Sequence, residues 1–318
     1  MALENVTATK TLFQRPLWAV VAFLGIDLVA AISLVMYIVV IVVILKHRKN
    51  RFPGTFYILM VAMGFSDVGC LLAHFLFLNL GNIVGEENLP YWYVVMWGLV
   101  WESLNNASTN HIFYIALNRL LAVCVPQSYE KYFNKFTLTL IIGSSYIIEI
   151  FYPLWMYHCT AFIHVRKLSY SHTYNLDSCA LLTFRGRQLQ DIICITASLA
   201  VNIATFVKVR SIRRSTGMAD NPANSKKELK MLLQFTSIFF FFTVYCIMFW
   251  VVDLWIQPKD GDALDLFHTA MFIVHSSVNP FMLLIFGSDI KALVFGGKKF
   301  GGGSSVAPTR TDKLASNA

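Results

Sequence analysis

The stretch ALNRLLAVCVP, residues 116–126, places Arg119 at the end of a long apolar run. The run begins near Val94 and is long enough to form a membrane-spanning helix. A charged side chain in the hydrocarbon core of a bilayer is costly, so we expect Arg119 at a membrane boundary. The rest of the chain decides which boundary that is.

The composition is that of an integral membrane protein. Of the 318 residues, 56% are hydrophobic and only 14% are charged, whereas about a quarter of the residues in a soluble domain are charged. The formal net charge of +8 raises nucleic-acid binding as an alternative. The basic residues are spread over short loops and form no basic domain, so we expect no nucleic-acid partner.

A helix needs about 20 predominantly apolar residues to cross a bilayer. Seven segments meet this requirement, namely residues 18–45, 56–80, 91–123, 136–157, 190–209, 232–256 and 266–286. They predict an all-α membrane protein with a seven-transmembrane helix bundle over residues 18–286. The connecting loops are short except for a polar connection over residues 158–187.

The basic residues predict the orientation of this bundle. Of the 26 Lys and Arg residues, 19 fall on the side that holds the C-terminus. The other seven are Lys10, Arg15, Arg166, Lys167, Arg185, Arg187 and Lys259. Cytoplasmic loops carry the excess of Lys and Arg, so we expect residues 1–17 outside, the C-terminus inside and Arg119 at the inner boundary. Asn5-Val6-Thr7 is a glycosylation sequon that fits an outer N-terminus, with a chance match as the alternative.

The spacing around Arg119 carries a family resemblance. Pro126 follows seven residues later, and then Tyr129. The stretch resembles the Asp/Glu-Arg-Tyr region of rhodopsin-like G-protein-coupled receptors, with Asn118 in place of the acid and Leu120 in place of the tyrosine. Asn-Arg with this proline is similar to the nematode chemosensory serpentine receptors.

Three further features resemble the same superfamily. Asp67 lies in mid-span after Ser66, and Asn279-Pro280 resembles the Asn-Pro-x-x-Tyr motif of the seventh span. Residues 287–295 resemble its short amphipathic inner helix, after which residues 296–318 form a Gly-rich tail that we expect to be disordered. Other short motifs, Leu89-Pro90 before Trp97-Gly98 and Tyr129-Glu130-Lys131, favour serpentine class V, with classes X and G as alternatives.

The sixth span departs from the family pattern. It lacks the Cys-Trp-x-Pro motif, so activation is expected to use other side chains. The phenylalanine run 239–242 is one candidate, and lipid-facing or core aromatics are the alternative reading.

The resemblance implies a chemosensory receptor in the plasma membrane, with the sensory cilium as a finer alternative. It would bind an external small molecule or peptide and activate a heterotrimeric G protein through Asn118, Arg119, Pro126 and Tyr129. The alternatives are a seven-helix transporter, a ligand-gated channel subunit and a receptor-like scaffold. The chain shows no enzyme motif, and no lysine in the seventh span could hold retinal, so we expect neither an enzyme nor an opsin.

Four polar residues fall near mid-membrane, together with Pro280. They are Asp67, Ser108, Ser276 and Asn279. The set resembles the receptors' internal sodium and water pocket, and a hydrogen-bonded polar cluster that packs the helices is the alternative. No other cofactor and no metal centre is expected.

A ligand site is expected higher in the bundle. Glu102 lies 17 residues before Arg119, which is about 25 Å along a helix. Trp101, Asn105 and Asn106 lie beside it or one turn deeper. A structural hydrogen bond is the alternative role for Glu102. Asp253 is the candidate from the sixth span, although Asp253 and Asp191 are both expected to extend toward the outer interface.

Two of the six cysteines, Cys159 and Cys179, fall in the long outer connection. That side of the membrane is oxidising, so a disulfide between them is expected, with two free thiols as the alternative.

Overall fold

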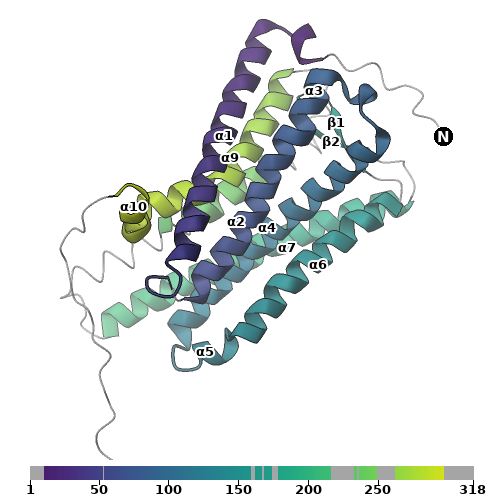
Figure 1. The fold of residues 1–318 in the computed structure, drawn as a ribbon. Coiled ribbons are helices and arrows are strands. Elements are labelled where there is room, and N and C mark those ends of the chain that lie inside the picture. The colour runs from purple at the N-terminus through teal and green to yellow at the C-terminus, as the bar shows by residue number, and fades with distance from the viewer. Residues whose placement is uncertain are drawn as a thin grey trace, which may run out of the picture.

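The computed structural model describes residues 11–52, 54–158, 162–166, 168–173, 178–215, 233–234, 236–248 and 262–296. The long helices lie side by side in one bundle (Figure 1). They are α1 (Leu17–Lys46), α2 (Thr55–Ala73), α4 (Tyr91–Cys124), α6 (Lys135–His158), α7 (Ser178–Ser215), the helix Thr236–Met248, and α9 (Asp262–Phe286). The predicted seven-helix bundle is confirmed, with the sixth helix described in part.

Short elements complete the described chain. They are η1 (Leu12–Gln14), η2 (His74–Asn79), α3 (Leu80–Val84), η3 (Glu86–Asn88), α5 (Tyr129–Tyr132), α10 (Ser288–Val294) and the strands β1 (Phe162–Arg166) and β2 (Ser169–Thr173). We call the end of the bundle that carries β1 and β2 the hairpin end, and the opposite end the α10 end (Figure 1).

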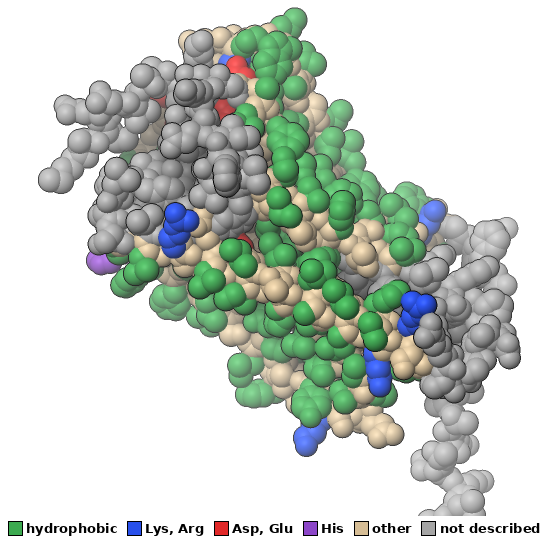
Figure 2. Space-filling model, turned by 180° about the vertical axis from the view of Figure 1, so that it is seen from behind, with side chains coloured by type: hydrophobic (Ala, Val, Ile, Leu, Met, Phe, Trp, Pro, Cys, Tyr) green, Lys and Arg blue, Asp and Glu red, His purple; other side chains and the backbone are tan. Residues whose placement is uncertain are grey.

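Five of the described helices are long and apolar enough to cross a membrane. They are Leu17–Lys46, Thr55–Val84, Lys135–Trp155, Arg185–Ile212 and Asp262–Phe286. The exposure of the side chains agrees with a location in a membrane. On α6, the apolar Ile148 is 58% exposed on the outer face, whereas the neighbouring Glu149 is 1% exposed. Hydrophobic side chains cover much of the face drawn in Figure 2. A surface of this kind is stable against lipid and not in water.

α4 lies at the centre of the bundle and packs against α2, α6 and α7, while α1 packs against α2 and α9. α4 is long enough to span the membrane but carries a run of polar residues between Glu102 and Asn110. Because the hydrocarbon core offers these groups no hydrogen-bond partners, they must be satisfied by the surrounding helices. This requirement accounts for the central position of α4.

A π-helical turn interrupts the second helix at His74–Asn79. π-Helical turns inside α-helices are frequently found at functional sites. Here the turn presents two side chains to Asp27 of α1: Nε2 of His74 lies 2.8 Å from one carboxylate oxygen, and Asn79 donates to the other at 2.9 Å. The acidic residue of the first span is therefore partnered inside the bundle.

The connection before the fifth helix differs from the prediction. The predicted span over residues 190–209 lies within the described span Arg185–Ile212, but the helix α7 extends further and begins at Ser178. The first turns of α7 contain Arg185, Arg187 and Gln188, whose polar side chains lower the hydropathy without disfavouring the helix.

The same connection contains an antiparallel hairpin, β1 with β2, that the sequence analysis did not predict. Leu168 lies between the two strands and is 0% exposed. Its carbonyl accepts a hydrogen bond from the Thr269 hydroxyl of α9 at 2.6 Å, and β1 also contacts α4. The hairpin therefore covers the space between α4 and α9 at this end.

Gly287 separates α9 from α10, and a Cβ atom there would lie 2.4 Å from the backbone carbonyl oxygen of Leu283. We expect Gly287→Ala to displace α10 and to cost about 1–3 kcal/mol in the free energy of unfolding, the usual range for a strained backbone. Thermal unfolding of the purified protein measures this cost as a lower Tm. Gly143→Ala is the matched control, because a Cβ at Gly143 meets nothing within 4 Å. An equal Tm for both variants would contradict the expected strain.

Candidate functional site

The polar residues predicted near mid-membrane come together around Asp67 of α2. Its carboxylate accepts hydrogen bonds from Ser108 of α4 at 2.6 Å and from the Asn279 amide of α9 at 2.9 Å. The hydroxyl of Tyr37 donates to the same carboxylate. Asp67 thus connects α1, α2, α4 and α9.

We call the cluster of Asp67, Ser108 and Asn279 the polar core. Its surroundings on α9 and α1 are as follows. Ser276 and Pro280 are buried on α9 next to Asn279 in the chain. The side-chain oxygen of Asn279 is buried and has no hydrogen-bond partner. Tyr37 was missed, because a tyrosine in an apolar helix carries no sequence signal of a buried hydrogen bond.

At the α10 end, Asn118 binds two hydroxyl groups. Its amide donates to the Tyr129 hydroxyl at 2.8 Å and to the Thr55 hydroxyl at 3.0 Å, and these two hydroxyls are hydrogen-bonded to each other. Three elements, α2, α4 and α5, therefore meet at Asn118. Pro126 is exposed in the turn that leads from α4 to α5.

Arg119 lies next to this group. Its guanidinium carbon is 3.7 Å from the centroid of the Phe56 ring, which is a cation–π contact. Sequence analysis placed Asn118, Arg119 and Tyr129 together but did not find Thr55 or Phe56, which precede the apolar centre of α2.

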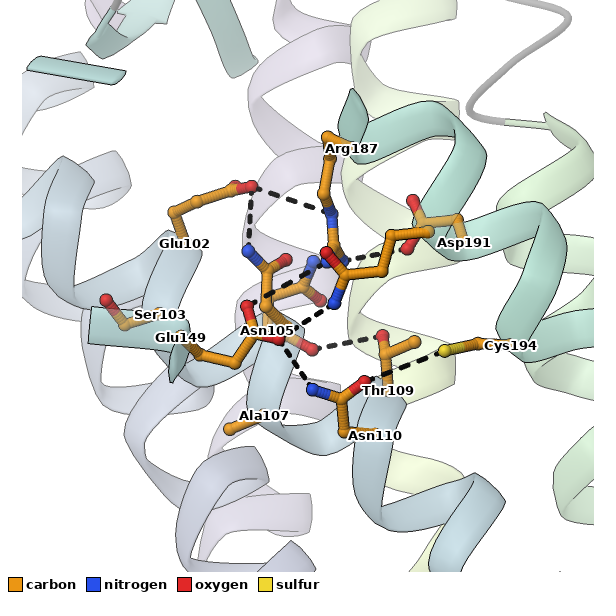
Figure 3. A network of polar contacts seen from close by, with 12 residues as sticks. Glu102, Ser103, Asn105, Ala107, Thr109, Asn110, Glu149, Arg187, Asp191 and Cys194 are labelled. Atoms are coloured by element: carbon orange, nitrogen blue, oxygen red, sulfur yellow. Dashed lines mark hydrogen bonds and ion pairs between the residues drawn. The ribbon is translucent and has the colours of Figure 1, made fainter. Parts of the chain in front are cut away.

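Nearer the hairpin end, Glu102 belongs to a charged network (Figure 3). Asn106 donates to its carboxylate at 3.1 Å. Arg187 of α7 lies 3.9 Å from Glu102, 4.0 Å from Glu149 of α6 and 2.9 Å from Asp191 one turn along α7. In Figure 3 the Arg187 side chain lies between Glu102 and Asp191.

Two expectations are corrected by this network. Arg187 was placed in the outer connection, but it lies in α7 and faces the bundle. Asp191 was expected to extend toward the interface, but it is buried and paired with Arg187. The pattern that signals both is the i, i+4 spacing of opposite charges, which puts them on one helix face.

A series of aromatic contacts connects this network with mid-membrane. Trp101 of α4 contacts Phe272 of α9, with ring centroids 5.3 Å apart, and Phe272 contacts Tyr245 of the helix Thr236–Met248 at 6.3 Å. Tyr245 stacks on His275 at 4.9 Å, and His275 contacts Phe242 at 5.4 Å. From Phe272 onward the rings alternate between α9 and the helix Thr236–Met248.

The phenylalanine run 239–242 contains both buried and exposed side chains, and its role in activation stays a prediction. Phe242 is 1% exposed and belongs to the aromatic series, whereas Phe240 is 59% exposed and faces outward. Asn105 is buried near Glu102 on α4.

Some predicted residues have no described placement. Cys179 is disulfide-bonded, while Cys159 lies outside the described residues, as do Asn5 and Asp253. Their predicted roles stay predictions.

The sequence of this bundle matches the model of a known family. The model of the serpentine type 7TM GPCR chemoreceptor Srv family matches residues 28–298. The chain belongs to this family. It is a G-protein-coupled chemosensory receptor of the class that the sequence motifs favoured, class V. The family is one of receptors and not of enzymes, and the match does not favour the transporter or channel alternative.

A solved structure shows the same fold. Squid rhodopsin matches this Srv receptor with a TM-score of 0.67 at 12% sequence identity, over 88% of this chain and 85% of the rhodopsin chain. At this identity the likeness concerns the fold alone. A comparison with curated proteins gives no match.

Asp67→Ala is expected to destabilise the Srv receptor strongly. The substitution leaves the donors of Tyr37, Ser108 and Asn279 without their acceptor, and an unsatisfied buried donor costs about 1–3 kcal/mol. Surface expression and the Tm of the purified protein should both fall. Asp289→Ala, at an exposed position of α10, is the control and should leave both unchanged. A normal Tm for Asp67→Ala would show that the carboxylate does not hold the helices together.

Proposed function

We propose that this Srv receptor lies in the plasma membrane with its hairpin end outside and its α10 end in the cytoplasm. The excess of Lys and Arg in the loops at the α10 end supports this orientation. A sequon at Asn5 and an oxidising environment for Cys159 and Cys179 fit the same arrangement. Localisation to a sensory cilium would be a special case of it.

The external ligand binds near Trp101, Glu102, Asn105 and Asn106, and Asp253 of the sixth span is a further candidate. The hairpin favours a small molecule over a large peptide, since Leu168 is buried and bound to Thr269 above this region. The ligand acts by its differential affinity for two states of the bundle. The aromatic series from Trp101 to Phe242 provides packed contacts from the ligand region to the sixth helix.

The heterotrimeric G protein binds at the α10 end, at a surface formed by Asn118, Arg119, Pro126 and Tyr129. The single observation that carries this proposal is the pair of contacts there. Asn118 connects α4 to α2 and α5 through neutral hydrogen bonds, and Arg119 is held by the Phe56 ring. Both contacts are weak enough to be exchanged for contacts with a partner.

The polar core fits a sodium ion. Hard cations take oxygen ligands, and the Asp67 carboxylate, the Ser108 hydroxyl and the unpartnered Asn279 oxygen supply three. Ser276 and Pro280 complete the α9 side of this region. A bound sodium ion would supply the positive charge that the buried carboxylate lacks, and the residues named would hold it.

Arg119→Ala is expected to lower ligand-stimulated G-protein signalling by about tenfold, within the usual range of coupling between two sites. Surface expression should persist, because the neighbouring Asn118 keeps its hydrogen bonds to Thr55 and Tyr129 in this variant. Second-messenger production and surface labelling in the same cells measure the two quantities. Arg48→Ala, an exposed arginine at the same end, is the control. Unchanged signalling in Arg119→Ala, with the receptor at the surface, would refute the role given to Arg119.

Sodium binding is expected to raise the Tm of the purified receptor by about 2–4 °C in sodium chloride relative to N-methylglucamine chloride at equal ionic strength. Asp67→Asn should abolish the difference. The alternative, a polar cluster that only packs the helices, predicts the same Tm in both salts.

A further inference from the structure

The charged network around Arg187 contains more negative than positive groups. Among the described side chains of the network, the carboxylates of Glu102, Glu149 and Asp191 surround one guanidinium. The Asp191 pair is the shortest of the three ion pairs, at 2.9 Å. Glu102 and Glu149 lie about 1 Å further away, at 3.9 and 4.0 Å.

The network is shielded from both water and lipid. Glu102, Glu149, Arg187 and Asp191 are all buried. Their neighbours along α6 and α7, such as Ile148 and Ile192, point outward and are exposed. Burying a charge without an opposite charge costs several kcal/mol. Among the described side chains one guanidinium faces three carboxylates, so an added positive charge would stabilise the network.

Three acceptor atoms of the network have no hydrogen-bond donor, namely Glu149 Oε2, the Asn106 side-chain oxygen and Asp191 Oδ1, and one donor, Arg187 Nη1, has no acceptor. One oxygen of Glu149 accepts from Asn110 at 2.5 Å and from Gln190 at 2.8 Å, while its other oxygen, Oε2, has no hydrogen-bond partner. The side-chain oxygen of Asn106, whose amide group binds Glu102, is also without a partner. Glu149 Oε2 and the Asn106 oxygen are buried, and each can accept a hydrogen bond from an added N–H or O–H donor.

An ammonium group satisfies both requirements together, since it brings one positive charge and several N–H donors and no acceptor. A carboxylate ligand would add a fourth negative group and would compete for a guanidinium that Asp191 already binds. A neutral alcohol would supply a donor but no charge. A metal ion is less suited, because no group of three or more His, Cys, Asp or Glu side chains arranged to hold one occurs among the described residues.

We propose that the Glu102–Glu149–Arg187–Asp191 network binds the ammonium group of a small organic cation, and that ligands of this Srv receptor are amines. This inference rests on the proposed function, because it specifies the chemistry of the ligand site. Glu149 Oε2 and the Asn106 side-chain oxygen accept from the ammonium, and Glu102 contributes the second charge. Arg187 keeps Asp191 as its partner.

The test uses the full-length receptor in lipid nanodiscs and probes of matched size. Phenethylammonium is compared with 2-phenylethanol and 3-phenylpropionate, and butylammonium with butanol and butanoate, at constant pH and ionic strength. Each ammonium probe at saturation is expected to raise the Tm by about 2–4 °C or more, by mass action on the folded state. The alcohols and carboxylates should leave it unchanged. If no ammonium probe stabilises the receptor, or if an alcohol or carboxylate does so equally, the proposal is wrong.

Glu149→Gln keeps the size of the side chain and an acceptor for Asn110 and Gln190 but removes the charge. It should weaken ammonium binding at least about tenfold, as expected for the loss of a charged hydrogen bond. Glu102→Gln is the second variant, should Glu149→Gln fold poorly. Asp27→Asn is the matched control, because this carboxylate binds His74 and Asn79 elsewhere in the bundle. It should shift the Tm baseline without changing the response to ammonium, and an equal loss in all three variants would count against the site.

Nucleotide exchange on heterotrimeric G protein, measured with the same nanodiscs, separates this proposal from the proposed function. Stabilisation by ammonium without any exchange supports the site and contradicts the ligand-to-G-protein function. Exchange stimulated by neutral or anionic compounds and not by amines supports that function and refutes the amine site.

Discussion

A polar helix inside a bilayer is stable only if other helices supply its hydrogen-bond partners. α4 is such a helix, and the arrangement of the bundle follows from this constraint. α2 brings Asp67 to Ser108, α6 brings Glu149 to Asn110, and α7 brings Arg187 to Glu102. Helices without such groups, like most of α1, can face lipid over much of their length. The residues proposed for the function of this Srv receptor are thus among the groups that also hold the bundle together.

The three polar regions lie in order along α4. Glu102 belongs to the first, Ser108 to the second and Asn118 with Arg119 to the third. Because α4 is a continuous helix from Tyr91 to Cys124, it fixes the depth of each region. Helices that contact α4 in two regions can transmit a change between them. α2 contacts α4 in two of these regions, through Asp67 with Ser108 and, nearer the α10 end, through Thr55 with Asn118.

The sequence predicted the parts of the receptor that depend on local patterns. Long apolar runs gave the helices, and the spacing of Asp67, Ser108 and Asn279 gave the polar core. It did not predict contacts that depend on how helices are rotated about their axes. Tyr37 and Phe56 belong to this group, since nothing in an apolar helix tells which aromatic side chain meets a carboxylate or a guanidinium. Arg187 was misplaced for another reason: hydropathy marks where a helix is apolar, and α7 continues as a helix through a polar segment.

Asn118 has a consequence for the energetics of activation. Where an acid neighbours the arginine, the resting contact is an ion pair, and protonation of the acid weakens it. Here an amide occupies that position and binds two hydroxyls, while the arginine lies against an aromatic ring. An amide has no proton to gain in the physiological range. The hydrogen bonds of Asn118 to Thr55 and Tyr129 are therefore independent of the acidity of the surrounding solution, and their release need not be accompanied by proton uptake at this position.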